Sequence, residues 1–372
     1  MRRVLVTGAS NIGKAGVATI VYKWGQHFDE NVCIYDYLMQ NGLPDEKYVA
    51  AIKNKGGRIF TMREPKSYLQ IIKWVTSVVH ENNYETIHIN SDSAYIAAAY
   101  IYAAKRGGIK NIYVHSHCTK IDDSNIVSRY IKTLLHYLCR FYVKKNTNLY
   151  LACSSLAGDW MFGKHIKSDP KYKLICNGVE VKDYVFNEEY RDKYRLELNL
   201  KDKIVIGNVG RISFQKNHEY LIKLFAEYHK ENNNSILVIV GMGDLYDAVR
   251  NQVCSLNLEN SVLFLGQRND VDKLLSAMDV LVMPSRFEGL PVTMIEAQMA
   301  SLPCIVSDTI TTEADFSGLV TYLKLGDYYP WVDAIREAVK IDRPIDTEIL
   351  EHSDFNIEYA AYKLQRVLIG NN

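Results

Sequence analysis

The chain has 372 residues, which is too long for one ordinary hydrophobic core and predicts two domains of α/β size. Hydrophobic residues make up 48% and charged residues 23%, which is globular composition and excludes a disordered or fibrous chain. Lys and Arg number 44 and Asp and Glu 43, and the resulting net charge of +1 argues against a protein that coats nucleic acid.

The seven cysteines indicate the redox compartment. Their number is odd and no two are spaced Cys-x-x-Cys, so we predict reduced thiols rather than a disulfide framework or a zinc site. We expect no secretory signal, because the apolar stretch after Met1 ends at Thr7. The longest apolar run, 94–104, is shorter than the roughly 20 residues of a membrane span. These features predict a cytoplasmic protein.

In the first half of the chain, short apolar strands alternate with stretches of helical length, such as Ser67–Glu81 and Ser93–Lys105. This alternation predicts a parallel sheet covered by helices on both faces. The strands are expected at Arg3–Thr7, Val32–Tyr37, Arg58–Met62, Thr86–Asn90, Asn111–His115 and Leu149–Cys153.

The alternation of strands and helices is interrupted in the middle of the chain and then resumes. Leu174–Val179 is predicted as a short strand that ends in a turn, and a charged stretch follows from Glu180 to Asp202. Further strands are expected at Ile204–Val209, Ile236–Val240, Val262–Leu265, Val280–Met283, Cys304–Ser307 and Val320–Leu325, with helices at Trp331–Val339 and Ile357–Leu368. We predict an α/β fold of two doubly wound Rossmann-like domains, residues 1–180 and 181–350, facing a central cleft. Residues 351–372 form a C-terminal helix that packs back toward the first domain.

Ligands of such sheets bind in the loops that follow the strands. The first of these loops, from Gly8 to Gly16, nearly matches a Walker phosphate loop, but Ala15 has no hydroxyl for Mg²⁺. It also differs by one residue from the glycine spacing of short-chain dehydrogenases. Two interpretations stay open: a glycine-rich turn whose backbone approaches a phosphate, and a tight turn with no ligand.

The strongest pattern runs from Pro284 to Glu296, where an apolar strand leads into a loop with an acid and a glycine. Pro291 then begins a helix whose first amides are unpaired, which suits a diphosphate. Glu288 lies just before that turn. Glu296 lies one to two turns into the helix, where its carboxylate can accept hydrogen bonds from a ribose.

Two carboxylates beside a diphosphate require cations. Arg211 and Lys216, in the loop after the first strand of the second domain, have suitable side chains for phosphate oxygens. Each residue alone is better explained without a ligand, Arg211 and Lys216 by a solvated loop and the two glutamates by an ordinary helix start. Their combination at one edge of one sheet favours a site.

These residues resemble the family-4 retaining glycosyltransferases. Glu288 and Glu296, separated by seven residues and beginning with the run Glu-Gly-Leu-Pro, look like the family's signature, as do Gly210, Arg211 and Lys216. The resemblance extends to Asn177-Gly178-Val179, Gly241-Met242-Gly243 and Leu265-Gly266 before Arg268. In the first half, Val114–His117 and Ala152–Gly158 are similar to the subgroup that builds bacterial capsule and exopolysaccharide repeats. One departure is the first loop, where many members have a paired glycine followed by an acid.

The resemblance implies the GT-B fold, with the nucleotide sugar in the second domain and the acceptor in the first. It implies Glu288 and His117 as catalytic residues. We expect no cofactor, and no metal because Arg211, Lys216 and the helix start at Pro291 can carry the positive charge. Donor contacts are expected from Gly16, Arg211, Lys216, Gly243, Arg268, Phe287, Gly289, Leu290, Pro291 and Glu296. Acceptor or sugar contacts are expected from Gly13, Lys14, His115 and Asn177.

Two of these assignments have alternatives. A family histidine in this position approaches the donor sugar, and we favour His117 over His115, although either can be an ordinary core histidine. The one Asp-x-Asp triplet, at Asp270 and Asp272, is a metal-binding pattern in other transferases. Here Asn269-Asp270 is better interpreted as a helix cap.

The stretch Asn125–Asn146 has five basic residues, four aromatic residues and no acid. A basic amphipathic helix can bind an anionic membrane surface, and it can equally be a core helix with a solvated basic edge. The resemblance favours the membrane, because acceptors in this subgroup are lipid-linked, and it implies attachment to the inner face of the cell membrane.

Taken together, these features predict a retaining, metal-independent transferase. It would move a hexose-type sugar from a nucleotide sugar, with UDP favoured, to a lipid-linked saccharide in capsular or exopolysaccharide synthesis. A nucleotide-sugar epimerase of similar fold and a non-catalytic partner subunit are the alternatives. No residue pattern selects the sugar, the linkage or an oligomeric state.

Overall fold

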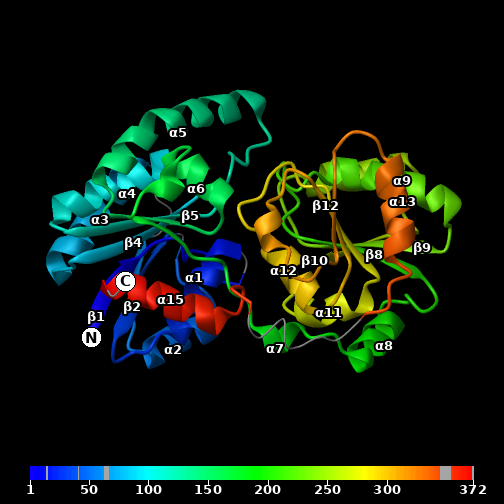
Figure 1. Cartoon of the computed structure of the whole chain (residues 1–372), viewed down its shortest axis with the longest axis horizontal. Coiled ribbons are helices and arrows are strands. Elements are labelled where there is room, and N and C mark those ends of the chain that lie inside the picture. Colours follow the sequence, from blue (N-terminus) through cyan, green and yellow to red (C-terminus); the bar gives the residue numbers. More distant parts are fainter. Residues whose placement is uncertain (14–15, 41, 63–66, 344–352, 371–372) are drawn as a thin grey trace. The chain divides into compact units, whose positions relative to one another are not determined.

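The computed structural model describes residues 1–13, 16–40, 42–62, 67–343 and 353–370. It divides into two compact units (Figure 1). The first unit contains Met1–Ile121, Ile126–Gly178 and Asp354–Asn372, and the second contains Asp122–Asn125 and Val179–Ser353. Lys14, one of the expected acceptor contacts, lies outside the described residues.

The first unit is built on a seven-stranded parallel sheet in the order β3-β2-β1-β4-β5-β6-β7. Its central strands are rich in β-branched residues and are buried on both sides, as expected for a parallel sheet. The strands are β1 Arg2–Val6, β2 Cys33–Gln40, β3 Ile59–Met62, β4 Thr86–Ser91, β5 Asn111–Ser116, β6 Leu149–Ala152 and β7 Tyr172–Leu174.

Helices lie on both faces of this sheet (Figure 1). One layer holds α3 Tyr68–Asn82, α4 Ala94–Gly107, α5 Ile126–Asn146 and α6 Ser155–Phe162. The other holds α1 Gly16–His27, α2 Glu46–Asn54 and the C-terminal helix α15 Ile357–Ile369. α15 packs against α1, and the Arg2 side chain donates to the carbonyl of Leu368 at 2.9 Å. The last helix of the chain thus completes the first unit.

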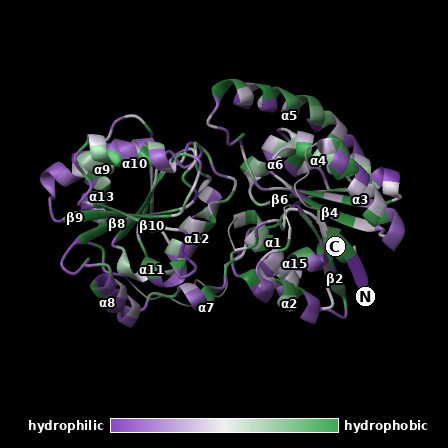
Figure 2. Cartoon of the chain, turned by 180° about the vertical axis from the view of Figure 1, so that it is seen from behind, coloured by the Kyte–Doolittle hydropathy of each residue, from purple (hydrophilic) through white to green (hydrophobic). Residues whose placement is uncertain are grey.

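The second unit contains a six-stranded parallel sheet in the order β10-β9-β8-β11-β12-β13. The strands are β8 Ile204–Val209, β9 Ser235–Val240, β10 Val262–Gly266, β11 Val280–Met283, β12 Cys304–Ser307 and β13 Val320–Leu323. On one side lie α9 His218–Glu231, α10 Tyr246–Ser255 and α13 Tyr329–Ala338, and on the other α7 Val181–Tyr184, α8 Glu188–Glu197, α11 Val271–Ala277 and α12 Val292–Met299 (Figures 1 and 2). Leu221, Phe225 and Tyr228 of α9 lie at i, i+4 and i+7 and are all buried in the core, so they form one apolar stripe of the helix.

Both sheets reverse their strand order at one point. In the first unit the chain winds outward from β1 through β2 and β3, and then returns to β4 on the other side of β1. In the second unit the same reversal separates β8 from β11. Open α/β sheets bind ligands at such switch points, where loops diverge beyond the carboxyl ends of two neighbouring strands.

The structure corrects two local predictions. The strand expected at Leu174–Val179 ends at Leu174, and residues 175–178 form an irregular segment that leads into the second unit. Asp270 occupies the position before α11 but its side chain makes no capping hydrogen bond. Its carboxylate instead binds the Arg268 side chain, a partner two residues away that competes with the backbone amides.

Candidate functional site

The switch point of the second unit brings three of the polar side chains together. Lys216 follows β8 and Glu288 follows β11, and Nζ of Lys216 lies 2.9 Å from Oε1 of Glu288. Nε2 of Gln215 donates to the other carboxylate oxygen, Oε2, at 2.7 Å. The Glu288 side chain is 6% exposed and that of Lys216 14%, so this is a largely desolvated charge pair. Lys216 and Glu288 were predicted from sequence, and Gln215 was not.

The two loops at this switch point are tied to each other. The side-chain amide of Asn217 donates to the carbonyl of Pro284 at 3.0 Å. The Arg286 guanidinium donates to the Phe214 carbonyl at 2.8 Å and lies over the Phe214 ring, and its backbone amide donates to Gln215. These bonds fix the backbone on both sides of Glu288, so its carboxylate is positioned before any ligand arrives.

Arg211 is placed differently from Lys216. Its side chain is 66% exposed and lies 3.1 Å from Asp244, which follows β9. The structure therefore brings Lys216, and not Arg211, into contact with Glu288. Arg211 is an exposed cation at the same edge of the sheet, held by a carboxylate of the neighbouring loop.

Gly243 has a packing explanation in the structure. A Cβ atom there would lie 2.1 Å from the carbonyl oxygen of Ile212, and one at Gly241 would lie 2.0 Å from the carbonyl oxygen of Gly210. These glycines let the loop after β9 approach the loop after β8. Contact with a donor is an additional role that the geometry does not require.

The segment before α12 is mostly buried. Phe287 is 2% exposed and packs near Phe214, and Leu290 is 6% exposed. Gly289 and Pro291 are buried as well, and α12 begins at Val292, one residue later than predicted. Glu296, in the second turn of α12, accepts a hydrogen bond from the Tyr184 hydroxyl at 2.7 Å. Burial and the adjacent carboxylate raise the pKa of Tyr184 well above its usual value, so it stays a donor.

Arg268 stands apart from this group. It follows β10, an edge strand separated from β11 by β9 and β8. Its guanidinium binds both carboxylate oxygens of Asp270 at 2.8 and 2.6 Å, and Asp270 also accepts from the Tyr194 hydroxyl at 2.7 Å. The hydrogen bonds from Arg268 hold the pKa of Asp270 below its usual range. In the described part of the chain, no three His, Cys, Asp or Glu side chains lie close enough together to hold a metal ion.

The switch point of the first unit holds His117. Asn90, at the end of β4, donates from its side chain to the carbonyl of Thr7 at the end of β1. Its other amide atom, Oδ1, lies 2.8 Å from Nε2 of His117. The loop after β1 passes closely over this asparagine, since a Cβ at Gly8 would lie 2.7 Å from the Cβ of Asn90. Asn90 thus links two neighbouring strands to the predicted histidine.

His117 belongs to a stack of buried rings. The His115 and His117 ring centroids are 4.3 Å apart, and Trp24 of α1 stacks on His115 at 5.1 Å. Nδ1 of His115 lies 3.3 Å from Nε2 of His88, whose Nδ1 contacts the Tyr35 hydroxyl at 2.6 Å. His115 is fully buried inside this network, whereas His117 is 6% exposed at its edge. The structure therefore makes His117 the more accessible of the two.

Burial keeps these histidines neutral at pH 7. It lowers the pKa of His88 and of His117 to about 3, and the pKa of His115 well below its usual value. A hydrogen bond with the Asn177 side chain opposes the shift at His117. Asn177, which follows β7, is thus near His117, as its assignment to the same site requires.

The remaining glycines of the first loop differ in their surroundings. Gly13 has a φ of 80°, and a Cβ there would lie 2.6 Å from the Tyr48 hydroxyl, so it is a turn glycine covered by α2. Its amide donates to Oγ1 of Thr19 at 3.0 Å. Gly16 is exposed at the start of α1 and would meet nothing within 4 Å if it had a Cβ. Gly16 therefore faces open space at the carboxyl edge of β1, whereas the space beside Gly13 is filled by Tyr48.

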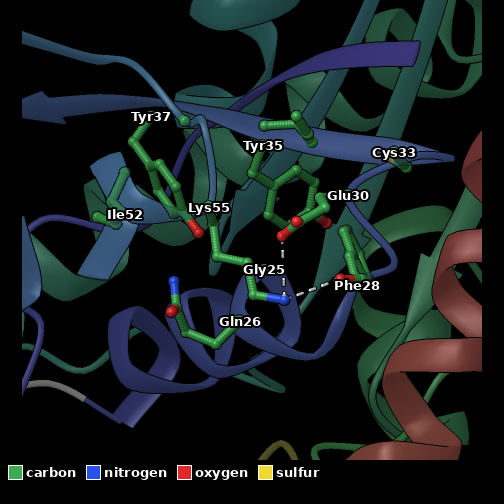
Figure 3. Close-up of a pocket in the computed structure, with 11 residues that line it drawn as sticks. Gly25, Gln26, Phe28, Glu30, Cys33, Tyr35, Tyr37, Ile52 and Lys55 are labelled. Carbon is green, nitrogen blue, oxygen red and sulfur yellow. Dashed lines mark hydrogen bonds and ion pairs between the residues drawn. The ribbon is translucent and has the colours of Figure 1, made fainter. Parts of the chain in front are cut away.

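A separate pocket lies between α1, β2 and α2 (Figure 3). Lys55 crosses it, with Nζ 3.6 Å from the Glu30 carboxylate and 3.4 Å from the Phe28 carbonyl. The pocket surrounds the first residues of β2, including Cys33, and contains none of the predicted site residues. It opens at the end of the strand opposite to the one where such sheets bind ligands.

Sequence reasoning missed the partners that hold the charged residues. Gln215 sits beside Lys216 in the same loop, and Asn90 ends an apolar strand at the edge where ligands bind. A polar residue that ends a buried strand is a detectable signal. Trp24 and His88 gave no signal, because both fit ordinary apolar or alternating patterns.

Several known proteins are similar to this chain in sequence or in fold. The family model described as glycosyl transferases group 1 matches residues 190–316. The chain is 30% identical over 343 residues to the putative glycosyltransferase EpsF of Bacillus subtilis, covering 90% of this chain and 87% of that protein. It is 28% identical over 321 residues to the UDP-Gal:alpha-D-GlcNAc-diphosphoundecaprenol alpha-1,3-galactosyltransferase of Escherichia coli, covering 83% and 80% of the two chains. The crystal structure of Anabaena Alr3699/HepE in complex with UDP-glucose superposes with a TM-score of 0.70 at 18% identity, covering 100% and 97%.

Two doubly wound sheets with their candidate sites at the strand reversals define the GT-B fold of glycosyltransferases, as predicted. The chain belongs to the group 1 glycosyltransferase family.

Proposed function

We propose that this protein transfers a hexose-type sugar from UDP to a lipid-linked saccharide during synthesis of a bacterial capsular or exopolysaccharide, with retention of anomeric configuration. The observation that supports the proposal is the buried Lys216–Glu288 pair at the switch point of the second unit. Family membership favours transfer over the alternative of an epimerase.

The donor assignment rests on charge. A nucleoside diphosphate that enters the loops after β8 and β11 meets Lys216 and the first amides of α12, with Arg211 exposed at the same edge. These groups offset the charge that develops on the leaving diphosphate. Glu296, which accepts from Tyr184, is the candidate for the ribose hydroxyls. UDP is favoured by the UDP named with the Anabaena structure and by the UDP-galactose donor in the name of the E. coli relative.

Glu288 is the candidate for the group that acts on the sugar. Its two oxygens are held by Lys216 and Gln215, so the carboxylate is fixed in place while sugar hydroxyls and oxocarbenium-like charge approach. His117 of the first unit is the second candidate catalytic residue. Because it is neutral and its Nε2 donates to Asn90, its Nδ1 can accept a hydrogen bond from a sugar hydroxyl without adding a cation.

The acceptor assignment rests on the relatives. The E. coli enzyme is named for an acceptor linked to diphosphoundecaprenol, and a Campylobacter jejuni relative that aligns with 38% of this chain is named for another diphospho-undecaprenol-linked acceptor. We therefore expect the acceptor of this chain to be a saccharide on a polyprenyl diphosphate.

The proposal is tested with the purified chain in two stages. Slow hydrolysis of UDP-glucose, UDP-galactose and their N-acetyl forms, compared with GDP- and ADP-sugars, identifies the donor. The selected donor is then incubated with saccharides on short polyprenyl diphosphates, and proton NMR of the product reports the anomer. A retained axial linkage supports the proposal. Release of free epimerised nucleotide sugar supports an epimerase, and absence of both binding and turnover with every nucleotide supports a non-catalytic subunit.

A further inference from the structure

The side-chain amide of Asn90 has only one orientation that satisfies both of its neighbours. Its Nδ2 lies 3.0 Å from the carbonyl oxygen of Thr7, which can only accept, and its Oδ1 lies 2.8 Å from Nε2 of His117. If the amide were turned over, two oxygens would face each other at Thr7. The backbone amide of Asn90 also donates to the Thr7 hydroxyl at 3.0 Å, which ties the two residues together. Asn90 is therefore an acceptor toward His117.

This orientation decides which nitrogen of His117 carries the proton. Burial lowers the pKa of His117 to about 3, so the ring is neutral near pH 7 and has one N–H group and one lone pair. Because Oδ1 of Asn90 accepts, Nε2 of His117 must donate. The proton is thus on Nε2, and Nδ1 keeps the lone pair.

Nδ1 is an unsatisfied acceptor in the described part of the chain. The hydrogen bond with Asn177 favours the charged ring, in which Nδ1 also carries a proton. In the neutral ring, Nδ1 of His117 and Oδ1 of Asn177 are both acceptors, and neither has a partner among the described residues. Two acceptors cannot satisfy each other, and a buried acceptor without a partner is unfavourable. A hydroxyl group that donates supplies what both atoms lack.

The ring of His117 is also fixed in space. His115 stacks on its face, with the ring centroids 4.3 Å apart and the planes 27° apart. His115 is fully buried, and its own Nδ1 lies 3.3 Å from Nε2 of His88. On the other partner, the backbone of Gly8 leaves Asn90 little room to rotate, because a Cβ there would lie 2.7 Å from the Cβ of Asn90. Asn90 at the ring edge and His115 on the ring face thus hold one orientation of His117.

We propose that Asn90 is a positioning residue that holds His117 in the Nε2–H tautomer, so that Nδ1 accepts a hydrogen bond from a hydroxyl of the transferred sugar. The identity of the ligand rests on the proposed function, whereas the tautomer follows from the two hydrogen bonds of Asn90. The consequence is a specificity: the sugar must offer a donor at this position. An analogue that lacks the hydrogen leaves a buried acceptor unpaired and is selected against.

The tautomer is measured first, on the wild-type chain with isotope-labelled histidine. Long-range proton–nitrogen correlation NMR distinguishes the two neutral tautomers from each other and from the charged ring, and His117→Gln assigns the signals. We expect the Nε2–H pattern near pH 7. In Asn90→Leu, which has a similar shape but no acceptor, we expect a mixture of the two tautomers.

The specificity is measured with the donor sugar that the chain transfers and with analogues in which one hydroxyl at a time is replaced by fluorine. Fluorine is small and cannot donate a hydrogen bond. One analogue should lose about 10- to 100-fold in kcat/KM with the wild type and less than about threefold with Asn90→Leu. The inductive effect of fluorine on the reaction is the same in both proteins, so the comparison removes it.

A double-mutant cycle shows whether Asn90 acts through His117. Once His117→Phe has removed the ring nitrogens, the addition of Asn90→Leu should lower kcat by less than about twofold. Asn208→Leu is the matched control, because Asn208 is buried and its Nδ2 joins β8 to the Val282 carbonyl of β11 at 2.8 Å, without contact to a histidine. This control should lower the free energy of unfolding as Asn90→Leu does, but leave the tautomer of His117 and the fluorine effect unchanged.

Three results would overturn the proposal: a wild-type ring protonated on Nδ1, a fluorine effect that is the same in the wild type and in Asn90→Leu, or additive losses in the cycle. The first needs no variant, so the proposal can be tested even if Asn90→Leu does not fold. Failure of the proposed function is distinguishable from failure of this inference. A chain that transfers sugar with an Nδ1–H ring overturns only the positioning role, whereas a chain with the Nε2–H ring and no transfer overturns only the proposed function.

Discussion

Lys216 and Glu288 form an ion pair between the loops after β8 and β11, with Nζ 2.9 Å from Oε1 and both side chains largely excluded from water. Gln215 occupies the other oxygen, so neither atom of the carboxylate is free to reorient. Removal of either side chain is strongly destabilising, because the charge of the other is then buried without a partner. In the proposed function, the same pair supplies a fixed anion for the sugar and a cation for the diphosphate.

Replacement of Glu288 should impair turnover and spare nucleotide binding. Glu288→Gln keeps the shape of the side chain and a hydrogen-bonding oxygen but removes the charge. We expect kcat to fall by about 10²–10³, as for loss of one preorganised electrostatic group, and Kd for UDP to change by less than about threefold. Glu259→Gln, an exposed acid of the same unit, is the matched control. Turnover like that of the wild type would remove Glu288 from the mechanism.

The two cations should differ in their effect on diphosphate binding. Lys216→Ala should weaken UDP binding by roughly 10- to 100-fold, because a charge-assisted hydrogen bond contributes about 1.5–3 kcal/mol. Arg211→Ala should cost less, since its side chain is 66% exposed and already paired with Asp244. Calorimetry with UDP and with uridine separates phosphate contacts from base contacts. Equal losses for both ligands would show that the loop does not face the diphosphate.

The Lys216–Glu288 pair also makes a prediction about stability. Lys216→Met should lower the free energy of unfolding by about 3 kcal/mol, because Glu288 is left as an unpaired buried charge. Adding Glu288→Gln to that variant should restore much of the loss. Urea unfolding of both single variants and the double variant measures the coupling. Additive effects would mean that the two side chains do not interact in solution.

The buried histidines predict acid sensitivity. His88 has a folded pKa of about 3 against an unfolded value of about 6.5, so between these values the unfolded chain binds a proton that the folded chain does not. Stability should therefore fall as the pH drops below about 6.5, and this contribution should level off near pH 3. His88→Gln should reduce the slope of unfolding free energy against pH by up to ~1.4 kcal/mol per pH unit. His80→Gln, on the exposed side of α3, should leave the slope unchanged.

The sequence predicted the strands of the second unit almost residue for residue, because short β-branched runs between turn signals have few alternative structures. Ile204–Val209, Val280–Met283 and Cys304–Ser307 all have the predicted bounds. The segment after Leu174 failed, because its residues match a strand in composition but the sheet ends at β7. Composition indicates whether a segment tends to form a strand. It does not show whether a neighbouring strand is available to pair with it.

The candidate site was predicted as residue types and not as pairs. Glu288 and Lys216 were found because charged side chains interrupt apolar patterns at strand ends. Their direct contact was not predicted. It depends on β8 and β11 being neighbours in the sheet, although β9 and β10 lie between them in sequence. The same limit explains α5, where periodicity revealed an amphipathic helix but not which of its faces is covered by α4 and α6.

Transfer should persist in excess EDTA. A departing diphosphate needs positive charge, and the second unit offers Lys216, Arg211 and the start of α12. The one Asp-x-Asp triplet is poorly suited to a metal, because Arg268 already holds both oxygens of Asp270.

The measurement is the initial rate of sugar transfer in excess EDTA and after addition of Mg²⁺ or Mn²⁺. We expect less than about a twofold difference between these conditions, and a similarly small effect of Asp270→Asn on kcat. That substitution should instead lower the free energy of unfolding slightly, by about 1 kcal/mol, because it weakens a partly exposed ion pair. If EDTA abolished transfer and Mn²⁺ restored it, and if Asp270→Asn had the same effect as EDTA, the cations assigned to the diphosphate would be insufficient. Asp270 would then have to exchange Arg268 for a metal ion when the donor binds.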